Sequence, residues 1–182
     1  MPRPTDLLAS ILAQVRGIAP SHDGDIAYFP CSVQLCDTSS RARVTIVDAD
    51  AFARHWGVLP DRSVVDARDV VLVAATPHRL PAPFADVLYK AGESGMGYCV
   101  FALRFRDGST QPYLTGNAVD FLEYPVGLHP VDVAGVDPHG GRGSETSFRA
   151  APFDWCPVAG LDAALGISRA PRWKFWHRAR AT

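Results

Sequence analysis

The chain has 182 residues, of which 47% are hydrophobic and 20% charged, and its formal net charge is −1. A chain of this length buries roughly 70% of its unfolded surface on folding, so a core can form without disulfides or metal. This composition excludes disorder along the whole chain. Because no apolar run reaches the length of a membrane span and no signal-peptide core is present, we expect a cytoplasmic protein whose four cysteines are thiols.

Asp6 is placed to begin the first helix, because apolar residues follow it at the three- and four-residue spacing of one helical face. Residues 26–35 are predicted to be extended, and residues 43–47, which are rich in β-branched side chains, to form a strand. Asp48 or Asp50 then caps a second helix.

The unbroken apolar run 70–75 predicts a central strand covered on both faces. A helix should follow from Pro83 to Gly92. Residues 98–106 alternate between apolar and polar side chains, and Asp107-Gly108 favours a type I′ hairpin turn.

The hairpin's return strand is expected at residues 109–114, near a sheet edge because Pro112 lacks an N–H group. Later in the chain the sequence favours extended structure at 117–124, a strand at 131–136, irregular structure at 152–160 and one helical turn at 162–166.

These elements predict an α+β fold with a mainly antiparallel sheet and helices on one face. The alternative is an SH3-like or half-open β-barrel with added helices. We expect residues 1–168 to form a single domain, followed by a separate C-terminal segment at 169–182.

The C-terminal segment 169–182 has a net charge of +5, whereas residues 1–168 have a net charge of −6. Large aromatic side chains seldom stay exposed without a partner. The segment therefore either packs on the acidic body or binds a partner, which is a protein or a second copy of the chain. The candidate partner-binding residues are Arg172, Trp173, Lys174, Trp176 and Arg178.

Metal-ligand spacing is incomplete in this sequence. Cys31 and Cys36 are separated by four residues, as in half of a zinc site, but no second close pair follows them. No two of the six histidines have the i, i+4 spacing of a helical zinc pair. We therefore predict no metal and no cofactor, and buried thiols are the simpler interpretation.

Two glycine-rich loops contain the candidate catalytic residues. Glu93 and Ser94 lie in the loop 92–97, and His139 and Arg142 lie in the loop 138–144, where backbone N–H groups and the guanidinium could bind an anion. Neither loop has the strand–loop–helix order of a nucleophile elbow or a dinucleotide motif. An enzyme would have to assemble these residues with His78 in the folded chain.

Three functions remain open from the sequence. The leading hypothesis is a small non-enzymatic bacterial module that binds a protein partner. The second is a hydrolase or transferase that acts on a phosphorylated or acidic small molecule. The third is a weak nucleic-acid-binding accessory protein, in which the tryptophans of the C-terminal segment stack on bases.

Overall fold

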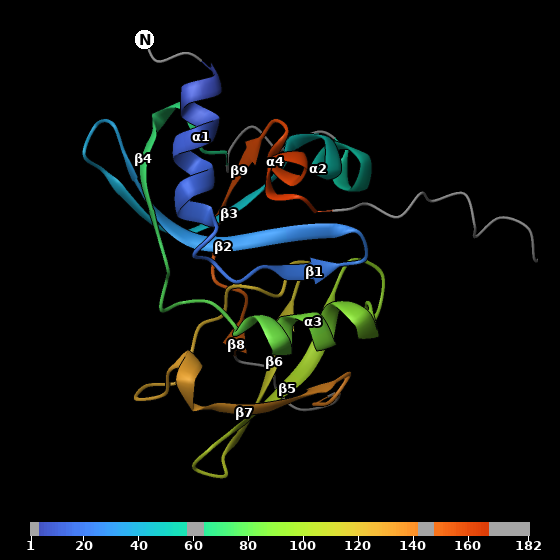
Figure 1. Ribbon diagram of the computed structural model, residues 1–182. Helices are drawn as coiled ribbons and strands as arrows, with labels where there is room; N and C mark the ends of the chain where they lie inside the picture. Colours follow the sequence, from blue (N-terminus) through green and yellow to red (C-terminus); the bar gives the residue numbers. More distant parts are fainter. Residues whose placement is uncertain (1–3, 58–63, 142–147, 168–182) are drawn as a thin grey trace, which may run out of the picture.

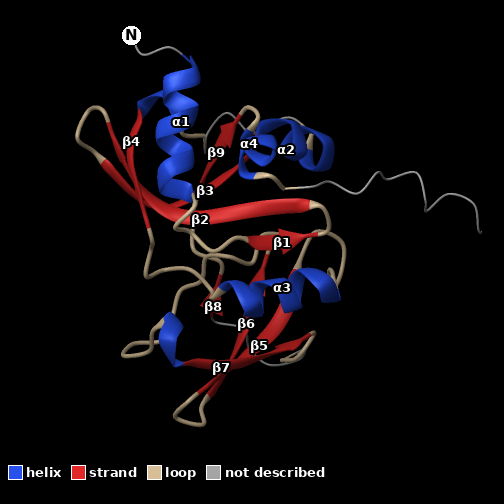
Figure 2. Cartoon of the chain, in the orientation of Figure 1, coloured by secondary structure: helices blue, strands red, loops and turns tan. Residues whose placement is uncertain are grey.

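The structure is a computed structural model, and it describes residues 4–57, 64–141 and 148–167. In these residues the strands form two sheets, and four α-helices surround them (Figures 1 and 2). The helices are α1 (Pro4–Val15), α2 (Ala49–Trp56), α3 (Ala82–Ala91) and α4 (Leu161–Leu165). The strands are β1 (Ser21–Asp23), β2 (Ile26–Leu35), β3 (Ser40–Asp48), β4 (Val70–Ala74), β5 (Cys99–Phe105), β6 (Thr110–Thr115), β7 (Val133–Pro138), β8 (Phe148–Arg149) and β9 (Asp154–Val158).

Pairing is antiparallel throughout both sheets except between β3 and β9 and between β6 and β8. The first sheet has the order β1-β2-β3-β9, with β4 also paired to β2, and the second has the order β7-β5-β6-β8. The predicted α+β class with mainly antiparallel pairing is confirmed. None of the helices in the described ranges is long and apolar enough to cross a bilayer.

Strand β2 organises the first sheet because two short strands share one of its edges. β1 pairs with β2 as far as Tyr28, and β4 pairs from Ser32 onward. Pro30 falls between these two partners, where the N–H group that proline lacks is not needed. The predicted extended segment 26–35 is confirmed, as is the strand predicted at 43–47, which is part of β3.

The prediction of a central strand at 70–75 is wrong. Among the described strands β4 pairs with β2 alone, and its side chains of Val71 and Leu72 are 52% and 49% exposed. A register shift in this pairing breaks the two-residue alternation, so that Val70 and Val73 face the core. The helix α1 covers that one face, and an apolar run therefore does not require two covered faces.

The predicted hairpin is confirmed as β5 and β6, but its turn is not type I′. Of Asp107 and Gly108, only Gly108 has a positive φ, at 87°. The N–H of Gly108 donates to the carbonyl of Phe105, whereas the N–H of Phe105 donates to the carbonyl of Ser109. This is the three-residue loop in which a glycine in the left-handed region follows an ordinary turn.

Three other boundaries differ from the sequence-based prediction. The first helix begins at Pro4 and not at Asp6, because proline suits the first helical turn. The segment 152–160, predicted to be irregular, contains β9, which pairs with β3 and lies at the end of the strand order. A strand in that position tolerates a proline, here Pro157. The strand predicted at 131–136 begins at Val133, after a 3₁₀ turn at Pro130–Asp132.

Helix ends follow the predicted capping chemistry. Asp48 accepts hydrogen bonds from the N–H groups of Asp50 and Ala51 at the start of α2. Pro83 lies in the first turn of α3, and Gly92 ends that helix with a φ of 76°. Residues 117–124, predicted to be extended, contain bends and the isolated β-bridge residues Phe121 and Leu122 and form no regular strand. The helical turn predicted at 162–166 corresponds to α4.

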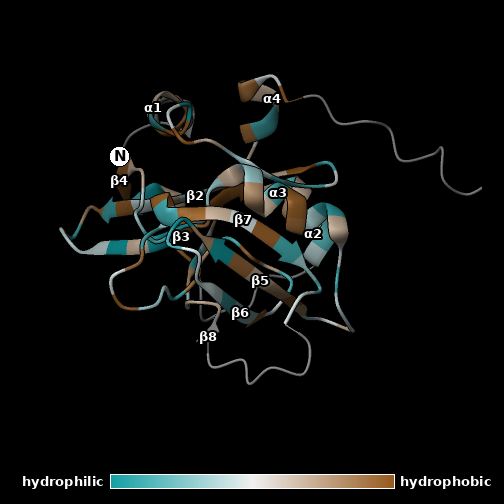
Figure 3. Cartoon of the chain, turned by 90° about the horizontal axis from the view of Figure 1, so that it is seen from below, coloured by the Kyte–Doolittle hydropathy of each residue, from teal (hydrophilic) through white to brown (hydrophobic). Residues whose placement is uncertain are grey.

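Each sheet has its own hydrophobic core. One core lies between the first sheet and α1, and the other lies between the second sheet and α3. Figure 3 shows α3 beside β7, on which it packs. The two parts meet where β1 lies against α3 (Figure 1). At this junction the fully buried carboxylate of Asp120 accepts hydrogen bonds from the hydroxyls of Ser21 and Tyr89.

Candidate functional site

The structure brings together two of the predicted catalytic residues. Ser94 lies in the loop between α3 and β5, and His139 follows the end of β7, where its backbone φ is 60°. The Oγ atom of Ser94 is 2.8 Å from Nδ1 of His139. A serine and a histidine at this distance have the first contact that nucleophilic catalysis requires.

The same hydroxyl also holds its own loop together. Its oxygen accepts a hydrogen bond of 2.8 Å from the N–H of Val100 and lies 3.1 Å from the carbonyl of that residue. Glu93 adds a second hydrogen bond within the same loop, because its Oε2 accepts the N–H of Gly97 at 2.8 Å. In the described part of the chain, no carboxylate lies within ion-pair distance of His139. The contact therefore fits a structural bond between two loops better than a catalytic dyad.

Among the other predicted residues, His78 is separated from this contact by α3. His78 precedes α3 and Ser94 follows it, and ten helical residues separate two such points by about 15 Å. Arg142 lies outside the described residues, as do Arg172, Trp173, Lys174, Trp176 and Arg178.

A different cleft, which we call the junction cleft, opens where the two sheets meet. Its volume is about 210 Å³. The ends of β1, α2 and α3 meet there with the start of β5 and the segment after β6. It is lined by Asp23, His55, Trp56, Leu88, Tyr89, Gly92, Glu93, Cys99 and Asn117.

Two carboxylates give the junction cleft a negative potential. Burial raises the pKa of the Asp23 carboxyl, His55 opposes that rise, and the charges of Asp25 and Glu93 add to it. Nε2 of His55 is 3.4 Å from Oδ2 of Asp23. The helices α2 and α3 both end at the cleft, and the partial negative charge of a helix C-terminus favours a cation by about 0.3–1 kcal/mol.

Aromatic side chains form fixed walls of the junction cleft. The indole Nε1–H of Trp56 donates to the hydroxyl of Tyr28 at 2.9 Å. The hydroxyl of Tyr89 donates to Asp120 at 2.6 Å, and its ring lies 5.6 Å from that of Tyr28. Because both walls are held by hydrogen bonds, little ordering is required when a ligand binds.

Cysteine, histidine, aspartate and asparagine together resemble the residue set of a cysteine hydrolase, but the electrostatics oppose that chemistry. Burial raises the pKa of the Cys99 thiol, and the negative charges of Glu93 and Asp23 raise it further. A nucleophilic cysteine needs the opposite environment, in which positive charge stabilises the thiolate. Among the described residues, no three histidine, cysteine or acidic side chains are arranged to hold one metal ion.

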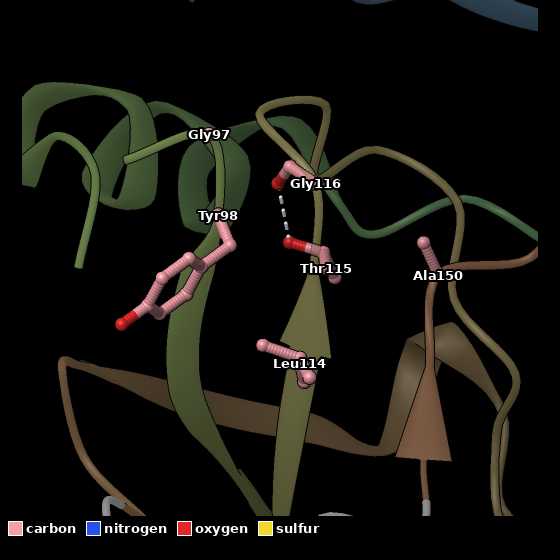
Figure 4. A pocket seen from close by; sticks show the side chains of 6 residues that line it. All are labelled: Gly97, Tyr98, Leu114, Thr115, Gly116 and Ala150. Carbon is pink, nitrogen blue, oxygen red and sulfur yellow. Dashed lines mark hydrogen bonds between the residues drawn. The ribbon is translucent and has the colours of Figure 1, made fainter. Parts of the chain in front are cut away.

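A second pocket lies between the loop before β5 and the end of β6 (Figure 4). It has a volume of about 590 Å³ and is broad and open. Its side chains offer little chemistry beyond the hydroxyls of Tyr98 and Thr115, and that of Thr115 donates to the carbonyl of Gly116. We therefore place the candidate site in the junction cleft, where charges and rings converge.

Of the residues that line the junction cleft, sequence reasoning named only Glu93 as a candidate functional residue. Asp23, Trp56 and Tyr89 come from three elements that are far apart in the sequence, and His55 precedes Trp56 in α2. The one available signal was the pair of helix ends at Gly57 and Gly92, which does not show that the two ends meet.

Comparisons with known proteins gave no match: no family model, no curated protein and no solved structure is similar to this chain. The function must therefore be argued from the geometry of the site.

Proposed function

We propose that the protein is a non-enzymatic binding module whose junction cleft holds a positively charged side chain, a lysine ammonium, of a protein partner. The observation that supports the proposal is the placement of Asp23 and Glu93 beside the rings of Trp56 and Tyr89 in one cleft. Carboxylates attract an ammonium group, and an aromatic face adds about 0.5–2 kcal/mol through the cation–π interaction.

The size of the junction cleft favours a side chain over a free substrate. Pockets that enclose small-molecule ligands usually measure about 300–1,000 Å³. The volume of about 210 Å³ is smaller than this range. A single extended side chain needs less room, because the rest of the partner stays outside and contacts the surface around the cleft.

The charge of the junction cleft also separates the competing hypotheses. An acidic or phosphorylated small molecule would be repelled by Asp23 and Glu93, and the same repulsion opposes the phosphates of a nucleic acid at this cleft.

The proposal is tested by titrating the chain with a Gly-Gly-Lys-Gly-Gly amide that is acetylated at its N-terminus and keeps a free lysine side chain. The Trp56 indole N–H signal is followed by NMR. We expect a saturable shift, weakened about tenfold in Asp23→Asn or Glu93→Gln because each variant removes one charge from the cleft. Asp50→Asn is the matched control, since its exposed carboxylate lies at the opposite end of α2. Equal affinity in the cleft variants and the control would refute the proposal.

The hypothesis that segment 169–182 binds a partner remains a proposal of its own. It is tested in the full chain by changing Arg172, Lys174 and Arg178 to glutamine. Weaker capture of a purified acidic protein by this variant would support partner binding. Tighter binding of the lysine peptide would instead show that the segment competes for the junction cleft.

A hydrolase centred on Ser94 and His139 is the second candidate, favoured by their 2.8 Å contact. Hydrolysis of p-nitrophenyl acetate and p-nitrophenyl phosphate should then be lost in Ser94→Ala. Ser109→Ala is the control, because its exposed hydroxyl bonds only within the hairpin turn. Equal rates in both variants would exclude Ser94 as the nucleophile.

A further inference from the structure

We propose that a third pocket, on the first sheet, binds a small oxyanion, a phosphate or carboxylate group, through Arg41 and Arg43. This site, the arginine pocket, lies beside β3 and the segment leading into β9 and has a volume of about 250 Å³. It is lined by Arg41, Ala42, Arg43, Pro152, Phe153 and Asp154. The inference does not depend on the function proposed for the junction cleft.

A buried donor without a partner points to a ligand in the arginine pocket. The Nε–H of Arg43 is buried from solvent and has no hydrogen-bond partner within the described ranges. Buried polar groups in native proteins are almost always paired, and an exception calls for a bound ion or water. A guanidinium only donates, so the missing partner must be an acceptor.

A neighbouring side chain on β3 has the same deficit. The hydroxyl of Thr45 is buried and also has no partner among the residues that the structure describes. The register of β3 against β2 shifts between Arg41 and Val44, so Arg43 and Thr45 share one face of β3 and the two-residue alternation does not extend to Arg41. Arg43 and Thr45 thus have unsatisfied polar groups on one face, and Arg41 adds a second guanidinium to the lining of the arginine pocket, where a group with several oxygens can bind both arginines.

The local charge balance leaves room for an anion. The carboxylate of Asp154 is the one acidic group that lines the arginine pocket, and its Oδ2 is 3.8 Å from Nε of Arg41. That distance marks a loose ion pair, and the described residues form no ion pair with Arg43. Arg104 on β5 shows the contrast, because its Nε lies 3.1 Å from Oδ2 of Asp137. An oxyanion bound side-on to the guanidinium of Arg43 would accept its Nε–H and balance its charge.

The experiment records the arginine Nε–Hε signals of the full chain by ¹H–¹⁵N NMR, with the Arg43 signal assigned by its loss in Arg43→Lys. Phosphate and acetate are titrated separately at constant ionic strength maintained with sodium chloride. We expect the Arg43 signal to shift saturably with at least one oxyanion. The anion with the lower midpoint then identifies phosphate or carboxylate as the preferred chemistry.

The variants test the assignment of the site. Arg41→Lys should raise the midpoint by about tenfold, because an ammonium cannot bind side-on, while Arg104→Lys should leave it unchanged. A rise in the melting temperature of the unmodified chain with the same anion gives a measurement that needs no variant. Absence of a saturable shift, or an equal shift with chloride alone, would overturn the proposal.

Discussion

Replacing Tyr89 by phenylalanine removes a single oxygen from the junction between the two sheets. That hydroxyl donates to Oδ2 of Asp120 at 2.6 Å and accepts the N–H of Val119 at 3.3 Å. A hydrogen bond to a charged group contributes about 1.5–3 kcal/mol, and a long neutral one about 0.5–1 kcal/mol. The variant should therefore lower the free energy of unfolding by about 2–4 kcal/mol at a pH where the carboxyl of Asp120 is ionised.

The loss should depend on pH. Burial raises the pKa of Asp120, and the hydrogen bonds from Ser21 and Tyr89 oppose that rise. The stabilising contribution of a group with a raised folded-state pKa is complete below the unfolded value and declines as pH rises through the folded value. Removing the Tyr89 hydroxyl raises the folded-state pKa of Asp120 further, so the additional loss develops as the carboxyl ionises. The destabilisation should be larger at pH 8 than at pH 4.

Urea unfolding followed by tryptophan fluorescence at the two pH values measures this effect. With an m-value of about 2 kcal/mol/M, a loss of 3 kcal/mol moves the midpoint by about 1.5 M. Tyr124→Phe is the control, because its hydroxyl donates to the neutral carbonyl of Arg79, and it should cost about 1 kcal/mol at both pH values. A loss below about 0.5 kcal/mol at both pH values in Tyr89→Phe would refute the reasoning.

Two further predictions concern a turn and the thiols. Gly95→Ala places a methyl group against the ring of Tyr98, so the partly exposed ring should swing away at a cost of about 1 kcal/mol, measured by urea unfolding and by the NMR shifts of the ring. Unchanged ring shifts would contradict this. Burial raises the pKa values of Cys31 and Cys156 to about 12, so iodoacetamide at pH 8 should label the exposed Cys36 first, as read by mass spectrometry. Equal labelling of all three thiols in the folded chain would show that these cores open readily.

Local signals in the sequence predicted much of the secondary structure. Asp48, Gly57 and Gly92 mark helix ends because capping depends on the residue itself and its nearest neighbours. The alternation before Asp107-Gly108 predicted the hairpin for the same reason, although the turn geometry depends on backbone angles that two residue types do not determine.

Features that depend on distant segments were not predictable from local signals. The run 70–75 forms β4 because β2 offers it a partner and α1 covers one of its faces, and β9 forms because β3 offers a parallel partner. The junction cleft depends on α2 and α3 ending at the same place, and no spacing in the sequence encodes that meeting. Ser94 and His139 meet through the pairing of β5 with β7.

The proposed role of the junction cleft is tested most directly by comparing two peptides that differ in one charge. Acetylation of the lysine in the Gly-Gly-Lys-Gly-Gly amide keeps the length of the side chain and removes its positive charge. If Asp23 and Glu93 hold an ammonium group, the unmodified peptide should bind at least about tenfold more tightly, with a difference that shrinks as salt is added. Equal affinity of the two peptides at low salt would contradict the account.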